Sequence, residues 1–79
     1  MKKTELIFRL TNLEIPQDSY SLDGGFPSET FVVSKNIIGW EFYYSERGSK
    51  TGQVNFHSEE EAYDYLHEVL KNEKGKNYF

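Results

Sequence analysis

The sequence contains no cysteine and only two prolines among its 79 residues. Without cysteine the chain can form neither a disulfide framework nor a thiolate metal site, and this composition suits a reducing compartment. A chain of this size buries only roughly 60% of the surface that its unfolded form exposes, so its core needs large side chains. The aromatic content of 16% meets that need, because each buried ring removes a large apolar area from water. We expect one domain that spans residues 1–79.

Long apolar runs are also lacking. The stretch that follows Met1, Lys2 and Lys3 is interrupted by Glu5 and Arg9, so it does not supply the apolar region of about 7–15 residues that a secretory signal needs. Nowhere does the chain approach the roughly 20 consecutive apolar residues of a membrane span. We therefore expect a cytoplasmic protein that does not enter a membrane.

Positive charge is scarce. Nine Lys and Arg stand against thirteen Asp and Glu, which gives a formal net charge of −4. This balance disfavours nucleic acid as a partner, because binding to a phosphate backbone comes mainly from Lys and Arg. Residues 14–29 and 57–68 carry carboxylates and no Lys or Arg at all. Each of these segments is either a solvated face or a surface that meets a partner.

The first part of the chain predicts a helix followed by a long loop. Residues 4–13 place leucines at i, i+4 and i+7, with Thr4 as the expected N-cap. Pro16 ends this pattern, because a residue that precedes proline is disfavoured in the α region. Residues 14–29 are rich in Pro, Gly, Asp and Ser, which predicts an irregular connection.

Three strands are expected next, as an antiparallel meander. They are residues 30–35, 37–45 and 53–57, with residues 47–52 as a polar turn between the last two. Alternation in the middle strand places four apolar side chains on one face, namely Ile38, Trp40, Phe42 and Tyr44.

The last element is predicted to be a helix that begins after Ser58. Ser58 and Glu61 have the spacing of a capping box, and Gly75 is the expected stop. Its apolar stripe follows the helical period: Ala62, Tyr65, Leu66, Val69 and Leu70.

Together these elements predict an α+β domain in the order helix, three antiparallel strands, helix. Both helices need the same sheet face, which is the one that carries Trp40 and Phe42. The opposite face would then be open to solvent and mostly polar. It would present Thr30, Val32, Glu41, Tyr43, Asn55 and His57.

Catalysis, metal and cofactors are not expected. His57 and His67 have no neighbours at metal-ligand spacing, and zinc needs three or four converging ligands. The serines suit strand, turn and capping positions, and no base stands ready to activate them. The element order is also that of double-stranded-RNA-binding domains, which hold phosphates with lysines at the start of their second helix. This chain has Glu59, Glu60 and Glu61 there, which would repel a phosphate backbone.

A protein partner fits these features better. Tyr43 and Tyr63 fall outside the apolar stripes, and exposed tyrosines beside acidic residues are typical anchors of protein interfaces. Carboxylates of the long loop and of the second helix would form a rim around them. We predict a partner-binding surface of Asp18, Asp23, Glu41, Tyr43, Glu59, Glu60, Tyr63 and Asp64.

Three stretches have a familiar pattern: LDGGFPSE at residues 22–29, WEFYYSERG at 40–48 and FHSEEEA at 56–62. They resemble a family of small bacterial immunity proteins, which are encoded beside polymorphic toxins and neutralise them by direct binding. The resemblance implies a cognate protein toxin as the partner, for example a basic nuclease, and an acidic chain suits such a target. The alternative is a regulatory or protein-interaction module that has no link to toxins.

The charge balance generates a first prediction. In a mobility-shift titration at low salt, where phosphate contacts are strongest, we expect no binding of nucleic acid at micromolar concentrations of this protein. Binding in that range would contradict the inference from charge.

Overall fold

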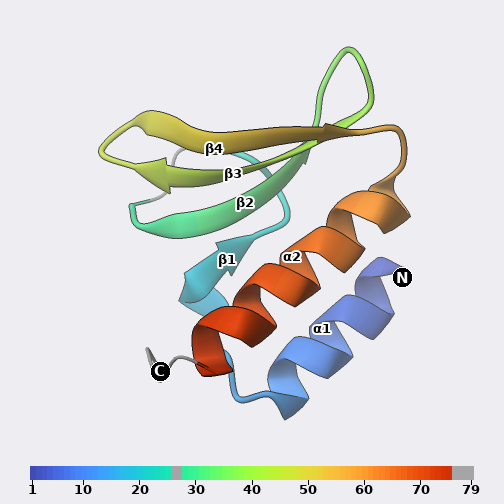
Figure 1. Ribbon diagram of the computed structural model, residues 1–79, viewed down its shortest axis with the longest axis vertical. Coiled ribbons are helices and arrows are strands. Elements are labelled where there is room, and N and C mark those ends of the chain that lie inside the picture. Colours follow the sequence, from blue (N-terminus) through green and yellow to red (C-terminus); the bar gives the residue numbers. More distant parts are fainter. Residues whose placement is uncertain (26–27, 76–79) are drawn as a thin grey trace.

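The computed structural model describes residues 1–25 and 28–75 (Figure 1). In chain order the elements are α1 (Lys3–Asn12), the 3₁₀ turn η1 (Gln17–Ser19), β1 (Tyr20–Ser21), β2 (Thr30–Lys35), β3 (Trp40–Glu46), β4 (Ser49–Phe56) and α2 (Glu59–Gly75). The fold is α+β, as expected, but the predicted three-stranded antiparallel meander is wrong. The sheet has four strands in the order β1-β2-β3-β4, and β1 runs parallel to β2.

The additional strand comes from the segment that was expected to be an irregular loop. Tyr20 pairs with Phe31 and Ser21 pairs with Val32. Two residues are too few to show the alternation by which a strand is recognised in a sequence. Tyr20 nevertheless contributes to the core, where its ring packs as a partly buried side chain.

Both helices lie on one side of the sheet, and they run in the same direction (Figure 1). The longer helix, α2, packs across β2, β3 and β4, whereas α1 packs against α2. The predicted sheet face is confirmed, because Phe42 is buried in the core and Trp40 packs against it as a partly buried ring. The buried part of this core consists of Leu6, Leu10, Ile15, Val33, Phe42, Ala62, Tyr63, Leu66 and Leu70.

The helix starts follow the predictions only in part. Ser58 caps α2 as expected, because its Oγ accepts a hydrogen bond from the N–H of Glu61 at 3.2 Å. The Glu61 carboxylate accepts from the hydroxyl of Ser58 at 3.1 Å. Thr4 was expected to cap α1, but it lies inside that helix, and Lys2 occupies the N-cap without a side-chain hydrogen bond.

The predicted turn at residues 47–52 is wrong in extent. Arg47 and Gly48 have φ angles of 51° and 77°, as the two central residues of a type I′ hairpin turn require. The strand therefore resumes at Ser49. Gly52, with φ of 62°, lies where the register between β3 and β4 shifts, so it supplies a bulge inside β4 and not the end of a loop.

The sheet face that was expected to be open is largely covered. Because β1 and β2 are parallel, the chain must travel back along the sheet between them, and in Figure 1 the part of this connection that follows β1, up to residue 25, passes behind the strands. Tyr43 on that face is only 2% exposed, and its hydroxyl donates to the carbonyl of Gly25 at 2.7 Å. Gly24 lies against Ser34, where an added Cβ would be 3.1 Å from the Cβ of the serine. Thr30, Val32, Glu41 and Ser45 are buried as well, whereas Asn55 and His57 are exposed, as expected.

The hydrogen bond between Tyr43 and Gly25 gives a prediction. Tyr43→Phe keeps the buried ring and removes the bond, so we expect the free energy of unfolding in urea to fall by about 1 kcal/mol. The connection at residues 22–29 should also become more sensitive to proteolysis. Tyr65→Phe is the matched control, because Tyr65 is partly in solvent. An equal effect of both substitutions would show that the bond does not hold the connection in place.

Candidate functional site

The structure separates the residues that were predicted to bind a partner into three groups. Glu41 and Tyr43 lie on the sheet face that the connection covers. Asp18 lies next to the start of β2, where its backbone carbonyl accepts a hydrogen bond from the Thr30 hydroxyl at 3.4 Å. The remaining five residues lie around the first turns of α2: Asp23, Glu59, Glu60, Tyr63 and Asp64.

Glu41 and Tyr43 are structural residues, so their expected exposure is wrong. The Glu41 carboxylate accepts hydrogen bonds from the ammonium group of Lys50, at 2.9 Å, and from the side-chain amide of Gln53. Burial alone would raise the pKa of this carboxyl, but the bonds from Lys50 and its other neighbours outweigh burial and lower the pKa. The Lys50 ammonium also lies 4.6 Å from the centre of the Tyr43 ring. Neither side chain is available to a partner in this arrangement.

Tyr63 was also expected to be exposed, and it is 2% exposed. The buried face of α2 is formed by Ala62, Tyr63, Leu66 and Leu70, while Tyr65, which was assigned to the apolar stripe, is partly in solvent. The reason is that α2 is buried by both the sheet and α1, and two neighbours cover a wider arc of the helix than a sheet alone. The Tyr63 ring packs on Trp40 with a centroid separation of 6.2 Å.

The electrostatics of Tyr63 show which carboxylates gather here. Burial, followed by the negative charge of Glu59 and a hydrogen bond with it, raises the pKa of Tyr63 from 10.0 to about 12, and Asp23 adds to this effect. Asp23 and Glu59 therefore lie close to the same hydroxyl, although they are far apart in sequence. Glu60 and Asp64 are exposed on the same helix.

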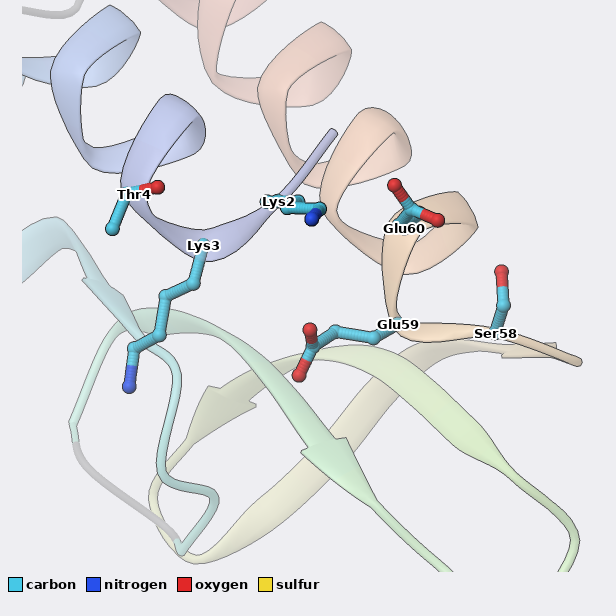
Figure 2. Close-up of a pocket in the computed structure, with 6 residues that line it drawn as sticks. All are labelled: Lys2, Lys3, Thr4, Ser58, Glu59 and Glu60. Carbon is cyan, nitrogen blue, oxygen red and sulfur yellow. The ribbon is translucent and has the colours of Figure 1, made fainter.

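A shallow hollow of about 470 Å³ lies between the first turns of the two helices, and Lys2, Lys3, Thr4, Ser58, Glu59 and Glu60 line it (Figure 2). In Figure 2 the Glu59 carboxylate points into the space between α2 and the strands, whereas Glu60 points away from them. The Met1 ammonium group pairs with the Asp64 carboxylate at 2.6 Å. The acidic start of α2 is thus partly neutralised by the start of α1. No local pattern in the sequence indicates this, because the parallel packing of the two helices brings the groups together.

The exposure of two apolar residues was not predicted. Ile38 was expected on the buried face of the middle strand, but β3 begins at Trp40, and Ile38 is 74% exposed. Its neighbour Ile37 is 104% exposed. Asn36 and Gly39, which favour turns, were the available signal that the chain leaves the sheet at this point.

The arrangement as a whole offers charge and apolar surface on a packed α+β fold. Among residues 1–25 and 28–75, no group of three or more His, Asp or Glu side chains is placed to hold a metal ion. Within the same residues, no helix is long and apolar enough to cross a membrane. Comparisons of the chain with protein-family models, with curated proteins and with solved structures found no match.

The raised pKa of Tyr63 predicts how the protein responds to alkali. The pKa of Tyr63 in the folded protein lies above the ordinary value of 10.0. The contribution of its neutral form to the stability of the fold is therefore complete below pH 10.0, and it is lost as the pH rises through about 12. In a tyrosinate absorbance titration, the Tyr63→Phe variant should lack an ionisation near the upper end of the range from pH 10.0 to about 12. The free energy of unfolding of this variant should also fall less steeply over that pH range than that of the wild-type protein. Tyr65→Phe is the control. A titration curve that Tyr63→Phe leaves unchanged at the upper end would contradict the assignment.

Proposed function

We propose that this protein is an immunity protein, which binds a cognate bacterial toxin in the cytoplasm and neutralises it by direct occlusion. In this proposal it acts without catalysis, metal or cofactor. The observation that supports it most is the packing of the stretches that carry the family resemblance. Residues 22–25 reach β3, which forms most of the stretch 40–48, through the bond between Tyr43 and Gly25, and residues 56–62 lead directly from β4 into α2. The resemblance therefore covers one packed unit and not scattered similarities.

The surface charge supports the same proposal. Asp18, Asp23, Glu60 and Asp64 are exposed, and Glu59 is half-buried. An acidic surface steers a basic partner into encounter and disfavours nucleic acid. A toxin that acts on nucleic acid has a basic cleft, and a protein that covers this cleft would block its substrate. Tyr43 and Tyr63 have no part in this contact, because both are buried.

The alternative is an interaction or regulatory module unrelated to toxins. The same exposed carboxylates would serve such a module equally well, so charge does not distinguish the two. The neighbouring open reading frame distinguishes the two proposals. A toxin domain encoded there favours immunity, and the absence of such a domain favours the alternative.

The proposal predicts protection and a salt-dependent association. Co-expression of this protein with the toxin domain of the neighbouring reading frame should restore growth. Reversing both Glu60 and Asp64 to lysine should slow association with that toxin by about tenfold at low salt and weaken its salt dependence, because steering acts mainly on the association rate.

The matched control is Glu29→Lys with Glu46→Lys. Both residues are exposed, and this pair changes the net charge by the same amount at the opposite end of the sheet. If association with the toxin slows equally in the two double variants, the effect is due to net charge and not to the start of α2. A wild-type chain that neither protects nor binds would end the immunity hypothesis.

A further inference from the structure

The most exposed apolar side chains of the described residues are adjacent, at the tip of the hairpin that joins β2 to β3. Ile37 and Ile38 are 104% and 74% exposed. We call residues 36–39 the hairpin tip. Single apolar residues on a surface are ordinary, but two neighbouring aliphatic side chains that are both largely exposed form a projecting apolar knob.

Backbone and side-chain hydrogen bonds fix the shape of the hairpin tip. The side-chain oxygen of Asn36 accepts from the N–H groups of Ile38 and Gly39, at 3.0 and 2.8 Å. The Asn36 N–H donates to the carbonyl of Gly39 at 2.9 Å. Gly39 in turn lies directly against β4, since an added Cβ would be 2.7 Å from the carbonyl oxygen of Phe56. A surface that is already ordered loses little conformational freedom when it binds.

The surroundings of the tip are polar, with the exposed Lys35 directly before Asn36, and the acidic residues lie further away on α2. Asn36 donates to the side chain of Asn55 at 3.5 Å, and His57 beside them is exposed. The chain continues through Ser58, whose hydroxyl bonds to the Glu61 carboxylate. An apolar centre with a polar rim is the usual anatomy of a protein interface.

One side of α2 extends this surface along β4. Glu61, Tyr65 and Glu68 lie at i, i+4 and i+7, so they share one side of the helix. That side is next to β4, because the Tyr65 ring lies 5.3 Å from the Phe56 ring. Glu61 and Glu68 are exposed. The hollow that contains Lys2 and Lys3 is lined by Glu59 and Glu60 and not by Glu61.

We propose that the hairpin tip inserts Ile37 and Ile38 into an apolar pocket of the toxin, and that Lys or Arg at the border of this pocket pairs with Glu61 and Glu68. This inference rests on the proposed function and adds the contact surface to it. A bilayer with anionic headgroups is a poorer occupant, because the same carboxylates would face negative charge. A second copy is also a poorer one, because a symmetric contact would bring like charges together.

Binding kinetics with the toxin domain of the neighbouring reading frame test this surface. Ile37→Asn with Ile38→Asn should weaken the affinity about 100-fold, mostly through faster dissociation, because apolar anchors act on the lifetime of a complex. Glu61→Gln with Glu68→Gln should slow association several-fold at low salt only. Glutamine at position 61 removes the charge and preserves a capping box. Phe8→Asn on α1 is the control, since Phe8 is 67% exposed and should leave the kinetics unchanged.

The outcomes separate the two proposals. If the wild-type chain binds the toxin and the double isoleucine variant, shown to be folded by its tryptophan fluorescence, binds within threefold of it, the hairpin tip is not the contact and immunity stands. If the wild-type chain does not bind, immunity fails and this inference fails with it. Sedimentation of the wild-type chain as a dimer that the isoleucine variant abolishes would assign the tip to a second copy. Pelleting with phosphatidylglycerol vesicles, lost in that variant, would assign it to a membrane. Either result overturns the proposal.

Discussion

The parallel pairing of β1 with β2 is the constraint on which the rest of this structure depends. It involves two residues of β1, Tyr20 and Ser21, and it determines where the chain must go next. A parallel neighbour cannot be reached by a tight turn, so the connection crosses a face of the sheet, and the helices already occupy the other one. The bond from Tyr43 to Gly25 and the close approach of Gly24 to Ser34 hold this crossing in place. The second face of the sheet is thereby covered over β2 and β3, while β4 stays largely exposed.

The same arrangement explains the charged groups within the fold. Glu41 lies under the connection between β1 and β2. It keeps its negative charge because Lys50 and the other hydrogen-bonding neighbours of the Glu41 carboxylate replace the water that burial removes. Where the two helices start side by side, the carboxylates of α2 meet the cations of α1, as the pair between Met1 and Asp64 illustrates. Acidic residues at the start of α2 also suit the positive end of its dipole.

These features change which surface a partner can reach. The broad sheet face is not accessible at Glu41 and Tyr43, and a partner is left with the ends and edges of the sheet. One end gathers the hydrogen-bonded apolar tip, the exposed end of β4 and the side of α2 that carries Glu61 and Glu68. This combination suits recognition of a folded protein better than recognition of an extended polymer, because the apolar part is small and projecting.

The sequence by itself determined the elements whose signals are local. Three features could be predicted from the sequence: the capping box at Ser58, the alternation that buries Phe42 and the α+β class. The reason is that periodicity and capping depend on neighbours within a few residues. Only the tertiary structure decided the features that depend on distant segments: the parallel β1, the covered sheet face, the burial of Tyr63 and the cations beside Glu59 and Glu60. Of the residues predicted to bind a partner, four carboxylates are exposed and Glu59 is half-buried, whereas Glu41, Tyr43 and Tyr63 are buried, contrary to the prediction. The physical reason is that a side chain's exposure is set by what packs over it, and no period in the sequence records which remote segment that will be.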